Sequence, residues 1–176
     1  MTRIDEIFSK AIEYASKRGH EYVALEHLML ALLESDEVME LCTNLESGDH
    51  TSAKRDLINY LDDDEVNCLV GENGYSGTPK RTMSIERVLQ RAYAQALFSA
   101  REQIDAIDLF VSMLSEEQSM AKYISELDGI GWYDVIQAMT REKRLAAENK
   151  EVSEFLKNLN EIALKNEIDP LIGREQ

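Results

Sequence analysis

The stretch ALEHLMLALL, Ala24–Leu33, predicts how the rest of the chain folds. All residues from Leu28 to Leu33 are apolar, and a helix that is apolar on every side must be buried. The segment DAIDLFVSML, Asp105–Leu114, has the same pattern and lies 81 positions later. The two segments therefore predict two central helices that occupy equivalent places in two halves of one fold.

The same spacing relates the segments that precede these two helices. Apolar residues of the first coincide with apolar residues of the second, and the pairs are Ile4 with Ile85, Ile7 with Val88, Phe8 with Leu89, Ala11 with Ala92, and Ala15 with Ala96. An internal repeat of this length indicates one helical unit that is used twice. We therefore expect an all-α fold of two pseudo-symmetric four-helix repeats, in which neither half buries its central helix alone.

Apolar spacing and capping residues give the boundaries of the expected helices. In the first half we expect Arg3–Arg18, Ala24–Glu34, Asp36–Leu45 and a fourth helix capped within Asp49–Ser52. In the second half we expect Ile85–Ala100 with Ser84 as its cap, Asp105–Leu114, Glu117–Leu127 and Trp132–Leu145. The buried face of the last helix is predicted to comprise Trp132, Val135, Ile136 and Met139.

The sequence also predicts a domain organisation. Residues 1–145 form one double-repeat domain, with repeats at about 1–63 and 82–145 and an acidic, glycine-containing connector at 64–81. Residues 146–154 are polar and are predicted to be a linker. The final segment, 155–176, contains a short amphipathic helix over Phe155–Ala163 and then the sequence IDPLIGRE.

Composition excludes several classes of partner. A net charge of −15 argues against nucleic acid, because phosphate binding requires clustered Lys and Arg. Residues 34–73 hold twelve acids and two bases, which fits either a solvated face or a docking surface for a basic partner. The charged amino terminus, the lack of long apolar runs and the isolated Cys42 and Cys68 predict a cytoplasmic protein without membrane spans.

No residue pattern points to catalysis, so we expect no catalytic residues and no enzyme activity in this chain. HEYVA at His20–Ala24 lacks the second histidine of HExxH, and the three histidines and two cysteines have no close ligand spacing, so no metal site is expected. GxSxG and the phosphate-binding GxxxxGK[ST] are absent from the sequence. Binding through a surface is the function that remains.

Three segments resemble one protein family. EYVALEHLMLALL at Glu21–Leu33 and SIERVLQRA at Ser84–Ala92 resemble the doubled N-terminal domain of the Clp family of AAA+ unfoldases. The tail FLKNLNEIALKNEIDPLIGRE at Phe155–Glu175 resembles the entry into the first AAA+ module of these proteins. Within the family, IDPLIGRE is most similar to the ClpA-like members, which feed the ClpP peptidase.

The resemblance implies a mobile domain that receives protein substrates and an adaptor of the ClpS type. It implies adaptor binding at Glu21, Glu26, Thr82 and Arg87, and contacts to adenine at Ile172 and Gly173 in the full-length protein. ATP and magnesium would be cofactors of that full-length protein, whereas this chain alone would carry none and would be monomeric. Ala24 departs from the family, which usually has a capping threonine there.

Other interpretations of these residues stay open. Glu21 and Glu26 could be ordinary acids at a helix start, favoured by the helix dipole, and Arg87 could pair with a neighbouring acid. The chain could also be a stand-alone regulator or decoy that mimics the domain and competes for adaptors.

Overall fold

The computed structural model describes residues 2–63, 65 and 74–164. The chain divides into two compact units, residues 1–138 and 139–176. Helices dominate both, and the all-α fold expected from the sequence is confirmed. Within the described residues, no helix is long and apolar enough to cross a membrane.

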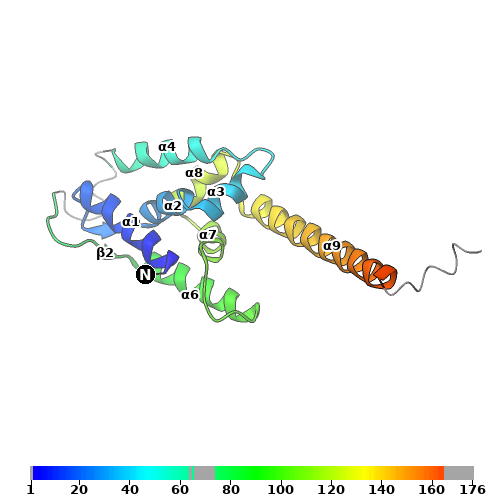
Figure 1. Cartoon of the computed structure of the whole chain (residues 1–176). Coiled ribbons are helices and arrows are strands. Elements are labelled where there is room, and N and C mark those ends of the chain that lie inside the picture. The colour runs from blue at the N-terminus through cyan, green and yellow to red at the C-terminus, as the bar shows by residue number, and fades with distance from the viewer. Residues whose placement is uncertain (1, 64, 66–73, 165–176) are drawn as a thin grey trace, which may run out of the picture. The chain divides into compact units, whose positions relative to one another are not determined.

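The first repeat consists of four helices, which are labelled in Figure 1. They are α1 (Arg3–Lys17), α2 (Leu25–Leu33), α3 (Asp36–Thr43) and α4 (His50–Leu61). The second repeat has the same order, with α6 (Met83–Phe98), α7 (Ala106–Leu114), α8 (Met120–Leu127) and α9 (Trp132–Leu164). The eight helices of the described part of the chain therefore fall into the two predicted sets of four.

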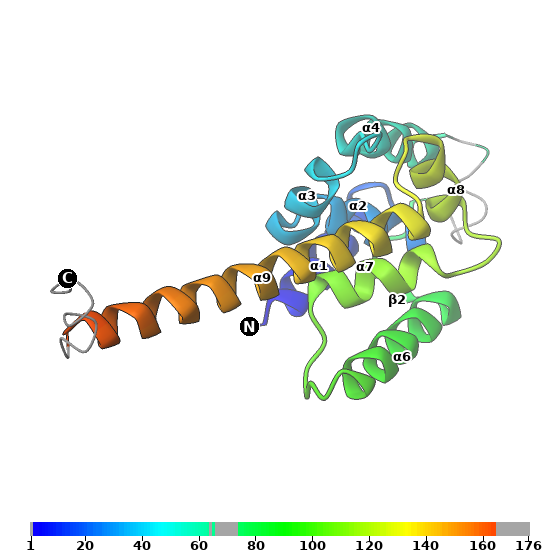
Figure 2. The ribbon, with the colours of Figure 1, turned by 90° about the vertical axis from the view of Figure 1, so that its right-hand side faces the viewer.

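The two central helices are α2 and α7, as predicted. Every residue from Leu28 to Leu33 is buried, and so is every residue from Asp108 to Leu114. Helix α2 packs against α1, α3, α4, α7 and α8, and α7 packs against α2, α3, α6 and α8 (Figure 2). The direct contact between α2 and α7 makes the two repeats share one core.

A short parallel ribbon, absent from the expected elements, joins the repeats at one side. Its strands are β1 (Tyr22–Val23) and β2 (Lys80–Arg81), with Tyr22 opposite Lys80 and Val23 opposite Arg81. The ribbon holds the end of the connector against the loop between α1 and α2. Alternation over two residues is too short a signal to predict a strand from sequence.

Two predicted helix starts are corrected by the structure. Helix α6 begins after Thr82, not Ser84, because the β2 strand leads directly into it. Helix α8 begins after Ser119, whose side chain accepts a hydrogen bond from the Lys122 N–H at 3.2 Å. The other expected helices of both repeats begin within a few residues of their predicted starts.

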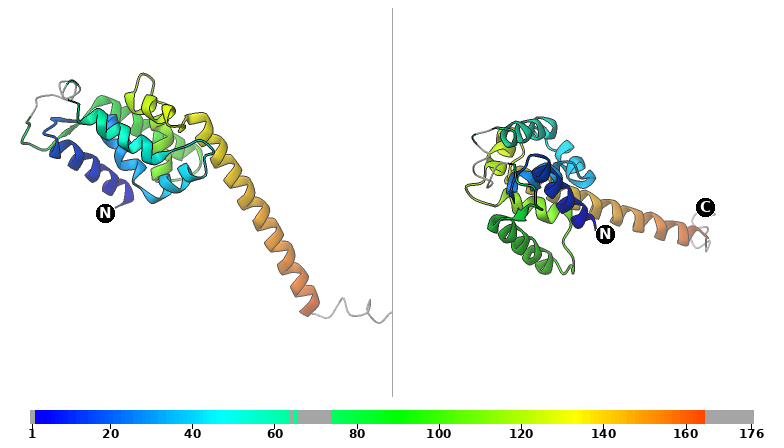
Figure 3. Two further views of the ribbon diagram at one scale, coloured as in Figure 1. Left: turned by 90° about the horizontal axis from the view of Figure 1, so that it is seen from above. Right: turned by 90° about the vertical axis from the view of Figure 1, so that its left-hand side faces the viewer.

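The predicted linker is a second correction. Helix α9 continues without a break through residues 146–154, so the linker and the predicted short helix are parts of one helix (Figure 3). These residues contain alanine, glutamate and lysine but no glycine or proline, so nothing in them ends a helix. The tail from 165 to 176 and connector residues 64 and 66–73 lie outside the described residues.

The buried face of α9 also differs from the prediction. Val135 is buried as expected, and Ala138 is buried as well, whereas Trp132 is 42% exposed. Every residue from Thr140 to Leu164 is exposed. Trp132 lies in the first turn of α9, at the end of the helix. The spacing of apolar residues along a helix does not determine whether a side chain at its end is buried.

Candidate functional site

Two of the four residues expected at an adaptor surface lie at the β1–β2 ribbon. Glu21 directly precedes β1 and Thr82 directly follows β2. The Glu21 carbonyl accepts a hydrogen bond from the Lys80 N–H at 2.9 Å, and the Val23 carbonyl accepts one from the Thr82 N–H at 3.3 Å. The ribbon thus brings together segments that are about 60 positions apart in the sequence.

Exposed side chains surround the ribbon. Tyr22 is 36% exposed and Met83 is 74% exposed. The Arg81 guanidinium lies 4.4 Å from the centroid of the Phe8 ring, a cation–π contact that fixes the ribbon to α1. We call the following residues the ribbon surface: Glu21, Tyr22, Lys80, Thr82 and Met83.

The Glu26 carboxyl group lies near the start of α8. It lies in the first turn of α2, and burial raises the pKa of its carboxyl group, while the Glu26 and Ala121 N–H groups act in the opposite direction. Its charge also raises the pKa of Tyr60 on α4, after the larger effect of burial. Glu26 therefore lies in a partly buried position near α4 and α8, surroundings that sequence reasoning did not predict.

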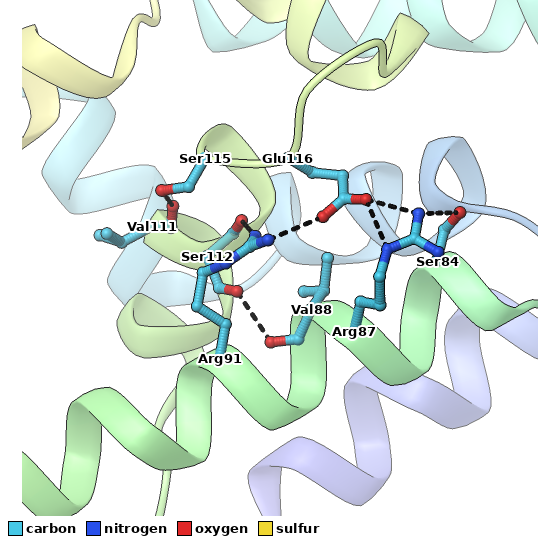
Figure 4. A network of polar contacts seen from close by, with 8 residues as sticks. All are labelled: Ser84, Arg87, Val88, Arg91, Val111, Ser112, Ser115 and Glu116. Carbon is cyan, nitrogen blue, oxygen red and sulfur yellow. Dashed lines mark hydrogen bonds and ion pairs between the residues drawn. The ribbon is translucent and has the colours of Figure 1, made fainter.

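Arg87 is bound to an acid within its own repeat (Figure 4). Its Nη2 donates to the Glu116 Oε1 at 2.7 Å and to the Ser84 Oγ at 3.1 Å. Arg91 donates to the Glu116 Oε2 at 3.1 Å and to the Ser112 carbonyl at 3.0 Å. The Glu116 side chain is only 7% exposed, so the two arginines neutralise a buried carboxylate between α6 and α7.

This pairing sets the charge of Glu116. Burial alone would raise the pKa of its carboxyl group, but the hydrogen bonds and charges of Arg87 and Arg91 hold that pKa below its ordinary value. Among the described residues, no hydrogen bond or ion pair joins Glu26 to Arg87. The four expected residues therefore separate into Glu21 and Thr82 at the ribbon, Glu26 beside α8, and Arg87 in the Glu116 network.

A buried histidine pair, absent from the sequence predictions, holds the start of α2. The His20 Nδ1 and His27 Nε2 lie 2.9 Å apart, and both side chains are almost fully buried. The His27 Nδ1 accepts a hydrogen bond from the Ala24 N–H at 2.9 Å. His27 therefore satisfies the N-cap amide, although the Ala24 side chain itself makes no capping hydrogen bond.

The second repeat has an ion pair at the same place. Arg101 and Asp108 lie 81 positions after His20 and His27, and their nitrogen and oxygen atoms approach to 2.5 Å and 2.7 Å. Asp108 accepts a hydrogen bond from the Asp105 N–H at 2.9 Å, as His27 does from Ala24. The repeat spacing was the signal that could have found both pairs, because it superposes them position by position.

Burial of the histidine pair predicts a pH-dependent stability. Burial, together with smaller effects from the charges of His20 and Arg18, lowers the pKa of His27 from 6.5 to about 3. Between these two values the unfolded chain binds more protons than the folded chain, so stability falls as the pH falls below about 6.5. From about pH 7.5 to pH 5, His27 should lower the free energy of unfolding by about 2 kcal/mol.

Urea unfolding at several pH values measures this effect. His27→Gln is the matched variant, because a glutamine at this position can accept the Ala24 N–H as in a capping box but cannot titrate. We expect the variant to lose most of the pH dependence in this range. Equal slopes for the variant and the original chain would show that another group titrates.

The chemistry of the remaining candidate residues is limited. Cys42 is buried, and burial raises the pKa of its thiol to about 12, which keeps it protonated and unreactive. Among residues 2–63, 65 and 74–164, no group of histidine, cysteine, aspartate or glutamate side chains could hold a metal ion. Cys68, Ile172 and Gly173 lie outside the described residues, so their predicted roles stay predictions.

Comparison with known proteins identifies relatives of the whole chain. A ClpA homolog protein of Fuscovulum blasticum is 28% identical over 200 residues, which cover 98% of this chain and 24% of that protein. The chaperone protein ClpB of Chlamydia pneumoniae is 23% identical over 181 residues, which cover 98% of this chain and 20% of that protein. The chain spans a quarter or less of the length of these relatives.

A solved structure has the same fold. The Hsp104 N-terminal domain from Candida albicans superposes with a TM-score of 0.64 at 12% identity, covering 77% of this chain and 85% of that one. The family model described as the Clp repeat (R) N-terminal domain matches residues 2–127, which include both central helices and the ribbon. The chain therefore belongs to the family of Clp repeat N-terminal domains.

Proposed function

We propose that the chain is the adaptor- and substrate-docking domain of a ClpA-like ATP-dependent unfoldase that delivers proteins to the ClpP peptidase. The observation that carries this proposal is the β1–β2 pairing. It gathers Glu21 and Thr82, two of the residues assigned to adaptor binding by resemblance, beside the exposed Tyr22 and Met83. ATP and magnesium would be bound by the AAA+ module of the longer protein.

The composition of the ribbon surface suits a protein partner. An exposed tyrosine and methionine provide apolar contact area, and both residue types are enriched at protein–protein interfaces. Glu21 and Lys80 add charges of opposite sign at the edge of this area. Charges at such an edge mainly orient the partner and raise the association rate, so binding should weaken as salt is added.

The structure changes which substitutions can test adaptor binding. Glu26→Lys would place a cation in a partly buried position, and Arg87→Glu would place a second acid beside Glu116. Both changes should lower stability as well as any affinity, because an unpaired buried charge is costly. Glu21 is the better position, since it lies at the ribbon beside the exposed Tyr22.

Glu21→Lys should weaken binding of a ClpS-type adaptor by about 1–3 kcal/mol through lost pairing and new repulsion. The measurement is calorimetric titration of the adaptor into the chain at low and moderate salt. Asp63→Lys is the matched control, because Asp63 is an exposed acid directly before the acidic connector, outside the ribbon surface. If Asp63→Lys abolished binding while Glu21→Lys preserved it, the acidic connector would be the docking surface.

A further inference from the structure

The loop before α7 follows the same path as the loop before α2. Gly19 and Ala100, 81 positions apart, both have a left-handed backbone, with φ of 67° and 57°. The His20 N–H donates to the Ala15 carbonyl and the Arg101 N–H to the Ala96 carbonyl, both at 2.9 Å. The segment Gln103–Ile104 therefore occupies in the second repeat the place that β1 occupies in the first.

The two equivalent segments differ in what covers them. β1 is paired with β2, the strand that leads into the first helix of the second repeat. The backbone groups of Glu102, Gln103 and Ile104 make no hydrogen bond to the backbone of any other described residue. An edge that has no backbone partner among the described residues can accept a further strand.

A groove lies along this unpaired edge. It has a volume of about 550 Å³ and runs between the α6–α7 segment and the amino-terminal end of α1. Its lining includes the apolar side chains of Ile4, Tyr93 and Ile104. The segment before α7 is visible next to the start of α1 in Figure 2. The groove therefore lies where a strand equivalent to β2 would lie in the second repeat.

The charge of the groove indicates which segment would fit. One arginine, Arg3, lines it, and its acidic residues are Asp5, Glu37, Glu102 and Asp105. Arg3 is paired with Glu37 at 2.6 Å and Asp105 with Arg101 at 3.2 Å, so Asp5 and Glu102 leave the groove negative. In the first repeat the equivalent place is filled by a lysine and an arginine, Lys80 and Arg81.

We propose that the Gln103–Ile104 edge accepts an extended basic segment of a partner protein as a parallel strand. The segment pairs with this edge as Lys80–Arg81 pairs with β1. One of its N–H groups donates to the Glu102 carbonyl, as the Lys80 N–H donates to the Glu21 carbonyl at 2.9 Å. Main-chain hydrogen bonds supply the affinity of such strand addition, and the acidic rim selects basic side chains.

This site is separate from the ribbon surface, so the two proposals can fail independently. The ribbon surface is built on β1, β2 and the start of α6, whereas the groove is lined by residues of α1, α3, the carboxyl half of α6 and the start of α7. Glu21→Lys should leave binding at the groove unchanged, and a ligand in the groove should leave adaptor binding at the ribbon surface unchanged.

The test uses the chain's own strand as the template for the ligand. The probe is the peptide SGTPKRTMS, residues 76–84, with both ends blocked. In NMR titrations of the 176-residue chain we expect the amide signals of residues 2–5 and 102–106 to shift. Binding should weaken as salt is added, because the basic peptide meets an acidic rim. Shifts confined to other residues would overturn the proposal.

Two methylated peptides separate strand pairing from charge attraction. Backbone N-methylation at the lysine removes the N–H that would donate to Glu102 but keeps the charge, and should weaken binding about five- to tenfold. N-methylation at the arginine is the matched control, because successive N–H groups along a strand point to opposite sides, and should change affinity less than about twofold. Equal loss for both peptides would overturn strand addition.

A second copy of the chain is the competing occupant. If the signals of residues 2–5 and 102–106 shifted with protein concentration in the absence of peptide, and sedimentation gave a dimer, the edge would be a self-association site and the proposal would be wrong. Concentration-independent signals and a monomer in sedimentation, together with the expected peptide shifts, support the partner segment.

Discussion

Leu28→Ala and Leu109→Ala should each lower the free energy of unfolding by about 2–5 kcal/mol. Both side chains are fully buried, at the same position of the two central helices α2 and α7. Truncation removes apolar contacts and leaves a cavity that the surrounding helices cannot fully close. The change should be seen as a lower midpoint in urea unfolding with an unchanged slope.

The control for these two variants is a leucine on the surface. Leu97 lies near the end of α6 and is 70% exposed, so Leu97→Ala should change stability by less than about 0.5 kcal/mol. If Leu28→Ala or Leu109→Ala behaved like Leu97→Ala, the helix concerned would not be central to the shared core. Because α2 and α7 contact one another, loss at either site should destabilise both repeats together.

Gly129→Ala should lower the free energy of unfolding by more than about 3 kcal/mol. Gly129 lies between α8 and α9 with φ of 80°, and a Cβ there would lie 1.9 Å from the Ser47 carbonyl oxygen. The neighbouring Asp128 carbonyl accepts a hydrogen bond from the Asp49 N–H at 2.9 Å. The substitution must push apart two backbone segments that join the first repeat to the second.

Gly74→Ala separates the two causes of this loss. Gly74 has a similar φ of 77°, but a Cβ there would meet no atom of a described residue within 4 Å. Its substitution should therefore cost only the left-handed backbone, about 1 kcal/mol. Urea unfolding of both variants measures the difference. Equal losses would mean that the contact with Ser47 relaxes without cost and that backbone conformation alone matters at Gly129.

Local sequence patterns predict much of the architecture. Leu28–Leu33 is wholly apolar and Leu109–Leu114 is apolar except for Ser112, so both segments are stable only when buried. Their spacing of 81 positions already implied two equivalent halves. Local sequence patterns determine the first residue of each helix less closely. Ser84 and Thr82 both belong to residue types that favour the N-cap position. Only the pairing of β2 with β1 selects Thr82 as the N-cap of α6.

The candidate site was only partly predictable for a physical reason. Sequence assigned one role to Glu21, Glu26 and Arg87, but these side chains lie in three different surroundings. Burial near α8 raises the pKa of Glu26. Arg87 pairs with Glu116, which lies 29 positions away in the sequence. Neither relation follows from helical spacing, because each depends on which helices pack side by side.

The sequence by itself determined that the chain is helical, doubled and built on two buried helices, because these properties follow from the spacing of apolar residues within short segments. Tertiary structure decided the rest. The repeat spacing aligns His20 and His27 with Arg101 and Asp108, but only the tertiary structure shows that each pair is in contact beside the start of a central helix. Only folding shows that Lys80–Arg81 covers β1 while Gln103–Ile104 has no backbone partner among the described residues, since strand pairing joins segments that are distant in sequence.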